Sequence, residues 1–252
     1  MGSFKQESME EGMLNPVRLN LKVKLFADGA DKAGMLEMYQ HPWIKGFTTN
    51  PTLMRKAGVT DYRNFARDVL TAIPDRPVSF EVLSDNFDEM ERQALEIASW
   101  GDNVNVKIPV TNTNGMESYD LVHKLSMQGV KVNVTAIMTV GQIEKVAAAI
   151  EGGAHAYVSV FAGRIADTGR DPVMLMRRAV HILEKTPNAE LIWASPRELL
   201  NILQADGVGC HIITATNDIL RKLYIVGKSL KDYSLETVQM FCSDATQAGF
   251  AI

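Results

Sequence analysis

Short apolar runs alternate with amphipathic segments along most of the chain, starting at Val23. The apolar runs are rich in Val, Ile and Phe, and most are bounded by Gly, Pro, Asn or Asp, which is typical of buried strands. We predict eight strands, at Val23–Gly29, Ile44–Asn50, Val78–Leu83, Val104–Val110, Val132–Ile137, Ala156–Arg164, Leu191–Ser195 and His211–Thr216. Between them the spacing predicts helices such as 61–72, 87–99, 115–127, 140–150, 172–184 and 197–203.

A strand followed by a helix, repeated along the chain, predicts parallel strands joined by right-handed crossovers. Eight such units in 252 residues favour a closed (β/α)8 barrel of the TIM type, an α/β fold with one catalytic domain over residues 21–252. An open doubly wound sheet is the alternative, although no Gly-x-Gly-x-x-Gly follows the first strand. Residues 1–20 are polar, and we expect a flexible extension there.

An extra helix is expected after the eighth strand. The sequence Ser-Leu-Glu-Thr at 234–237 resembles a capping box, which would make Ser234 the N-cap. A helix that follows a complete barrel can pack on the barrel or on a neighbouring subunit, and we expect homo-oligomers.

Composition narrows the classes of partner. The formal charge of −4 gives no basic footprint for nucleic acid or for an anionic membrane, and no apolar stretch is long enough to cross a bilayer. Two cysteines, Cys210 and Cys242, have no metal-ligand or disulfide spacing, and the start of the chain lacks the apolar core of a signal peptide. We expect a cytoplasmic protein that acts on small polar molecules.

One residue breaks the apolar pattern of the fourth predicted strand. Val104, Val106, Ile108 and Val110 share one face, so Lys107 points to the other face of a buried strand. A lysine at such a position is commonly paired with a carboxylate or extended to solvent from an edge. Burial also favours the neutral amine, which is the nucleophile that forms Schiff bases with carbonyl substrates.

Polar residues on other strands share the inward parity of Lys107 or follow the strand end. Each has an ordinary alternative: Asp28 can cap a helix, Thr135 is a common strand residue, and Arg164 can form a surface ion pair. Their coincidence on several strands of one barrel predicts a site for a polyhydroxylated substrate at its C-terminal mouth. The set comprises Asp28, Asn50, Glu81, Lys107, Asn133, Thr135, Ser159, Arg164, Ser195 and Arg197.

Motifs around these residues resemble the transaldolases and fructose-6-phosphate aldolases, in the order of that family. They are FADGAD at Asp28, GFTTNP at Asn50, FEV at Glu81, VKIPVT at Lys107, NVTAIM at Asn133, SVFAGRI from Ser159 and WASPRE from Trp193. The resemblance implies the barrel fold, sugar-phosphate substrates, no cofactor and no metal.

The resemblance also implies roles for the matching residues. Lys107 would be the Schiff-base lysine, Asp28 would accept the proton of the donor's C4 hydroxyl, and Glu81 and Thr135 would hold the shuttling water. The dihydroxyacetone part would lie against three polar residues, and the phosphate against three others. These are Asn50, Asn133 and Ser159 for the first, and Arg164, Ser195 and Arg197 for the second.

Phe161 separates the two subgroups, because transaldolases carry Phe there and the aldolases carry Tyr. We therefore expect transfer of dihydroxyacetone from sedoheptulose 7-phosphate or fructose 6-phosphate to an aldose phosphate, as in the pentose phosphate pathway. Release of free dihydroxyacetone is the alternative. A non-catalytic sugar-phosphate-binding barrel is a more remote alternative, because Lys107, Glu81 and Asp28 are all present. Deoxyribose-phosphate-type or decarboxylating lysine chemistry is also remote, because the TTNP and SVFAGRI motifs argue against it.

Overall fold

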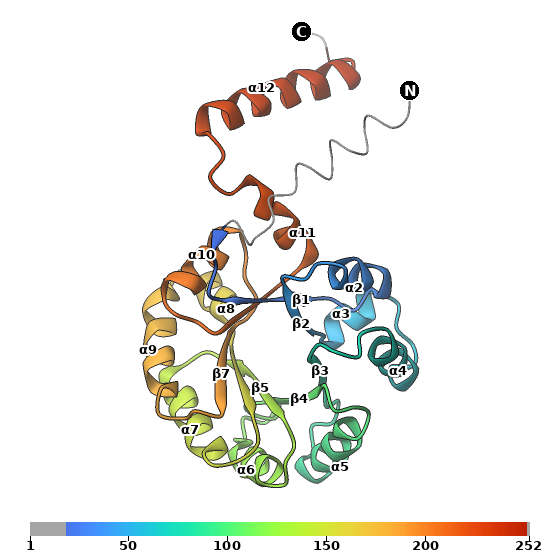
Figure 1. Cartoon of the computed structure of the whole chain (residues 1–252), viewed down its shortest axis with the longest axis vertical. Helices are drawn as coiled ribbons and strands as arrows, with labels where there is room; N and C mark the ends of the chain where they lie inside the picture. The colour runs from blue at the N-terminus through green and yellow to red at the C-terminus, as the bar shows by residue number, and fades with distance from the viewer. Residues whose placement is uncertain (1–18, 251–252) are drawn as a thin grey trace.

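Eight parallel strands close into a barrel in sequence order in the computed structural model, which describes residues 19–250 (Figure 1). The strands are β1 Lys24–Asp28, β2 Ile44–Thr48, β3 Val78–Glu81, β4 Val104–Pro109, β5 Val132–Ile137, β6 Ala156–Val160, β7 Ala189–Trp193 and β8 Ile212–Ala215. Strand β8 pairs with β1, which closes the ring. The predicted TIM-type barrel is confirmed, and the alternative of an open sheet was wrong.

Helices surround the barrel and alternate with its strands (Figure 1). They are α2 Lys32–Tyr39, α3 Pro51–Lys56, α4 Tyr62–Ala72, α5 Phe87–Ala98, α6 Tyr119–Met127, α7 Val140–Ile150, α8 Ala162–Asp167, α9 Val173–Leu183, α10 Leu200–Gly207, α11 Asn217–Leu220 and α12 Leu230–Gln247, with a 3-10 turn at Arg221–Ile225. No helix among residues 19–250 is long and apolar enough to cross a membrane.

The sixth strand is shorter than the sequence predicts. It ends at Val160, and the backbone turns at Phe161 into α8, so that Arg164 lies on a helix and not at a strand end. Most of the extension expected at residues 1–20 lies outside the described residues.

The C-terminal helix exists, but it begins earlier than expected. Gly227 takes a positive φ of 77°, and Ser229 caps α12 by accepting a hydrogen bond from the Asp232 N–H. Ser234 therefore lies inside the helix, and its assignment as the N-cap was wrong. Helix α12 projects away from the barrel, and none of its side chains is buried (Figure 1).

Apolar side chains fill the barrel below its C-terminal mouth. Phe26 and Tyr157 meet edge to face inside the barrel, with ring centroids 5.8 Å apart, and Ile192 and Ile212 pack against them. Gly46 on β2 makes this packing possible, because a Cβ there would lie 2.5 Å from the Phe26 ring. These apolar side chains form the floor of the barrel interior, and polar side chains lie between this floor and the C-terminal mouth.

Candidate active site

A cavity of about 450 Å³ opens at the C-terminal ends of the strands. Every site residue proposed from the sequence lines it: Asp28, Asn50, Glu81, Lys107, Asn133, Thr135, Ser159, Phe161, Arg164, Ser195 and Arg197. The barrel thereby brings together residues that lie up to 169 positions apart, from Asp28 to Arg197. Thr48, Thr214 and Ala136 also line the cavity, and sequence reasoning had not selected them.

Lys107 is 6% exposed and reaches the cavity from β4. Its Nζ lies 3.1 Å from Glu81 Oε2 and donates a hydrogen bond to the Thr49 carbonyl at 2.8 Å. Glu81 is paired with Lys107 across β3 and β4, and Thr49 directly follows β2. Lys107 is therefore both paired with a carboxylate and directed into the cavity, so the ordinary and the catalytic interpretations describe the same geometry.

Asp28 ends β1 and accepts a hydrogen bond from one of two linked threonines. The Thr48 hydroxyl donates to Asp28 Oδ1 at 2.7 Å, and it also contacts the hydroxyl of Thr214. Burial raises the pKa of Asp28, while the positive charge of Lys107 and the Thr48 hydrogen bond act in the opposite direction. A carboxylate with a raised pKa is a stronger base for a hydroxyl proton.

The amide of Asn133 lies in a buried chain of hydrogen bonds. Its Nδ2 donates to Ser79 Oγ at 3.0 Å, and its Oδ1 accepts from Ser159 Oγ at 2.7 Å. The amide thus joins serine hydroxyls from β3 and β6. Asn50 has a second function, because its Oδ1 caps α3 by accepting from the Leu53 N–H.

Thr135 presents a buried hydroxyl that has no hydrogen-bond partner among the described residues. The residue after it, Ala136, has a φ of 63°, and the pairing of β5 with β6 shifts between Val134 and Ile137. A left-handed conformation at a non-glycine residue is strained and is frequent at functional sites. The strained bulge leaves Thr135 Oγ1 available to a water or a substrate oxygen.

A second strained corner carries the guanidinium groups. Ser195 has a φ of 61°, and its carbonyl and hydroxyl both accept hydrogen bonds from Nη1 of Arg197, at 3.1 and 2.9 Å. Asp167 occupies the Nε and Nη2 edge of the same guanidinium. Arg164 is exposed, and no ion pair involves it within residues 19–250.

The two arginines are therefore not equivalent, which the sequence did not indicate. Asp167 forms a salt bridge with Arg197, whereas Arg164 has only a longer-range charge interaction with this carboxylate. Phe161 lies half-buried between this corner and the apolar floor. Within residues 19–250, no group of three or more His, Cys, Asp or Glu side chains is arranged to hold a metal ion.

Comparisons with a family model and with individual proteins point to the same family. A model of the Transaldolase/Fructose-6-phosphate aldolase family matches residues 25–252. A protein of Thermoanaerobacter sp. named "Probable transaldolase" is 36% identical over 91% of this chain and 100% of its own length. Another of that name from Dehalococcoides mccartyi is 34% identical over 80% of this chain and 90% of its own length.

Solved structures support the fold independently. The crystal structure of a dihydrodipicolinate synthase from Rhodopseudomonas palustris aligns with a TM-score of 0.56 over 88% of this chain and 79% of that chain. The two sequences are only 12% identical, so this similarity concerns the fold alone.

Proposed function

The chain belongs to the transaldolase/fructose-6-phosphate aldolase family, and on this basis we propose that it is a Schiff-base transaldolase. It transfers a dihydroxyacetone unit from a ketose phosphate, sedoheptulose 7-phosphate or fructose 6-phosphate, to an aldose phosphate. Lys107 carries the unit between the two sugars.

The environment of Lys107 is the observation that carries the proposal. Its Nζ is enclosed in a cavity lined by hydroxyl, amide and guanidinium groups, with Glu81 Oε2 at 3.1 Å. An ammonium must lose a proton before its nitrogen can attack a carbonyl carbon, and Glu81 is within reach to accept it. The same cavity offers hydrogen bonds to the hydroxyl groups of a sugar.

Carbon–carbon cleavage follows from the groups around the imine. Attack of Lys107 Nζ on C2 of the ketose and loss of water give a protonated imine, which withdraws electrons from C3. Asp28 then takes the proton of the C4 hydroxyl, the C3–C4 bond breaks, and its electron pair forms an enamine as the aldose leaves. Attack of the enamine on an acceptor aldehyde reverses these steps.

Formation and hydrolysis of the imine need a water that can exchange protons. Thr135 has the buried hydroxyl without a hydrogen-bond partner among residues 19–250, and Glu81 lies beside the lysine nitrogen. We propose that these two residues hold that water. Asn50, Asn133 and Ser159 bind the dihydroxyacetone portion, and the hydrogen bonds that join Asn133 to Ser79 and Ser159 hold its amide in place.

The exposed corner suits the substrate phosphate. Arg164, the Ser195 hydroxyl and Arg197 would bind it, and Arg197 would exchange part of its hydrogen bonds to Asp167 and Ser195 for bonds to the phosphate. A guanidinium forms charged hydrogen bonds with phosphate oxygens.

Phe161 favours transfer over release of free dihydroxyacetone. It lines the cavity and brings no hydroxyl with which to protonate the enamine or activate water. The aldolase reaction is the alternative. Donor consumption with and without erythrose 4-phosphate separates the two, since a transferase needs the acceptor and an aldolase does not.

We also propose a homo-oligomer that acts in cytoplasmic carbohydrate metabolism of the pentose phosphate type. Leu235, Val238 and Phe241 lie three residues apart on α12, and each is more than half exposed. Cover by a neighbouring subunit would remove this apolar face from water. Cys210 and Cys242 are both free thiols, which suits a reducing compartment.

Reductive trapping tests the reaction directly. Borohydride added with fructose 6-phosphate should reduce the imine to a stable adduct, which peptide mass spectrometry should locate on Lys107. Lys107→Ala should form no adduct and should show no transfer. An adduct on another lysine, or none with either ketose phosphate, would exclude this mechanism.

A further inference from the structure

The hydrogen-bond ladder between β2 and β3 ends one step early, beside the catalytic lysine. Phe47 N–H donates to the Pro77 carbonyl, and Thr49 N–H donates to the Ser79 carbonyl at 3.1 Å. In a regular parallel ladder the next bond would run from the Glu81 N–H to the Thr49 carbonyl. That bond is replaced by two others.

Tyr62 takes one half of the missing bond. The Glu81 N–H donates to the Tyr62 hydroxyl at 2.8 Å, and the hydroxyl donates to the Glu81 carbonyl at 2.9 Å. Lys107 takes the other half, because its Nζ donates to the freed Thr49 carbonyl at 2.8 Å. A phenol from α4 thus substitutes for a strand, and a main-chain acceptor becomes available to the lysine.

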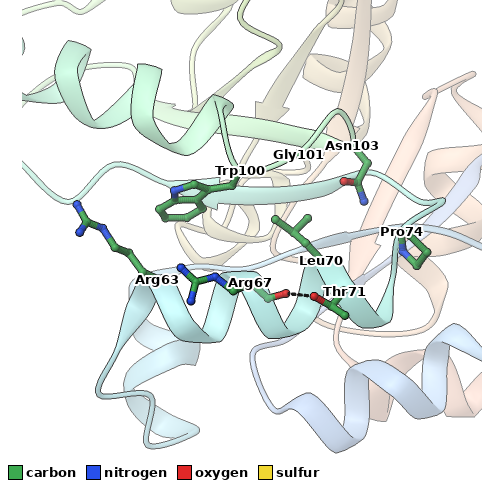
Figure 2. Close-up of a pocket in the computed structure, with 8 residues that line it drawn as sticks. All are labelled: Arg63, Arg67, Leu70, Thr71, Pro74, Trp100, Gly101 and Asn103. Carbon is green, nitrogen blue, oxygen red and sulfur yellow. Dashed lines mark hydrogen bonds between the residues drawn. The ribbon is translucent and has the colours of Figure 1, made fainter.

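Packing holds the Tyr62 ring in place. It meets Trp100 edge to face, with centroids 5.6 Å apart, and contacts Phe80 at 6.2 Å. Trp100 lies on the outer side, where it borders a groove between α4 and the segment before β4 (Figure 2). Burial raises the pKa of Tyr62 far above its ordinary value, so the phenol stays neutral and can donate and accept at once.

We propose that Tyr62 is a positioning residue for imine formation. By holding the backbone of Glu81, it sets the direction of the Glu81 carboxylate and leaves the Thr49 carbonyl to Lys107. This inference rests on the proposed function, but it concerns a residue outside the cavity lining. Tyr62 touches neither the substrate nor the reacting atoms.

Tyr62→Phe removes the hydroxyl and keeps the ring between Phe80 and Trp100. We expect the rate of borohydride-trapped adduct formation at saturating fructose 6-phosphate to fall roughly ten-fold, as for loss of one buried hydrogen bond. The half-saturating donor concentration should stay within about two-fold, since no substrate contact is lost. Tyr157→Phe is the matched control: it removes a phenol from the barrel floor and should leave the trapping rate unchanged.

A double-mutant cycle with Glu81→Gln separates positioning from general destabilisation. If Tyr62 acts through Glu81, Tyr62→Phe should slow the Glu81→Gln enzyme by less than about two-fold, whereas independent effects multiply. Multiplied losses, or a wild-type trapping rate in Tyr62→Phe, would overturn the proposal.

A crystal structure of Tyr62→Phe gives a readout that does not depend on activity. We expect the Glu81 N–H to donate to the Thr49 carbonyl and the Lys107 contact with that carbonyl to be lost. An unchanged contact between Lys107 and Thr49 would overturn the inference. Failure of the wild-type protein to form any adduct would instead count against the proposed function, and the crystal structure would still decide the role of Tyr62.

Discussion

Gly163 lies where the proposed phosphate corner has no room for a side chain. A Cβ at this position would lie 1.5 Å from the carbonyl oxygen of Ser195 and 2.7 Å from its carbonyl carbon. The same carbonyl accepts a hydrogen bond from Arg197, and Ser195 is already in a left-handed conformation. Gly163→Ala therefore displaces the corner without changing any charged residue.

The size of the displacement follows from contact distances. Real Cβ atoms essentially never approach another atom closer than 3.0 Å, so the Ser195 carbonyl or α8 must move by about 1.5 Å. A misplacement of about 1 Å can cost about 100-fold in rate when positioning is involved. We expect kcat/KM for fructose 6-phosphate to fall by roughly that factor, with stability lowered by about 1–3 kcal/mol through overpacking.

The assay compares fructose 6-phosphate with fructose as donor, because only the first carries the phosphate. Gly163→Ala should lower kcat/KM for the phosphorylated donor far more than for the free sugar. Gly141→Ala is the control, since no atom of the described part of the chain beyond its own neighbours lies within 4 Å of its Cβ position in α7, and helix propensity favours alanine there. Equal losses on both donors would show that this corner does not bind phosphate, and wild-type kinetics would refute the packing argument.

Three further outcomes are expected. Phe161→Tyr should increase dihydroxyacetone release without an acceptor, measured by coupled oxidation of a nicotinamide cofactor; unchanged release would remove the basis for the subgroup assignment. The His155 and Lys24 hydrogen bonds lower the pKa of Glu190 to about 2 from an ordinary 4.5. The ionised carboxylate should therefore add about 1–2 kcal/mol to the free energy of unfolding, allowing for solvent screening. This stabilisation should be present above pH 4.5 and lost as the pH falls toward 2. Glu190→Gln should remove this pH dependence in urea titrations without changing adduct formation at neutral pH, and a persisting slope of the same size would contradict the assignment. Phe241→Asp on α12 should lower the molar mass measured by light scattering; an unchanged mass would mean that α12 is not the interface.

The alternation of apolar runs predicted the barrel because each strand buries one face against the helices and the other inside the ring. Boundaries were less reliable where a turn changed the backbone direction. Strand β6 ended early because Phe161 starts α8, and Ser229 rather than Ser234 capped α12 because the turn at Gly227 placed it first. Where a strand ends or a helix begins depends on the backbone φ and ψ angles of a few residues, and the pattern of side chains specifies these angles weakly.

The candidate site was predictable to the extent that its residues share inward parity or carry family motifs. Thr48 lies within the TTNP sequence and could have been selected by its position before Asn50. Thr214 and Asp167 gave no comparable signal, because a threonine in a strand and an aspartate in a helix are ordinary. Their importance comes from contacts with residues distant in the sequence: Thr214 meets Thr48, which binds Asp28, and Asp167 binds Arg197.

The sequence by itself determined that a lysine would point inward from a buried strand, because the two-residue period of a strand leaves no other face for Lys107. It also determined that polar residues would collect at one end of the barrel. Only the tertiary structure decided which groups Lys107 meets. It meets Glu81 and the Thr49 carbonyl at the point where β2 and β3 lack one hydrogen bond and Tyr62 from α4 binds the Glu81 N–H instead. Such partners lie far apart in the chain, and their distances are set only when the barrel closes.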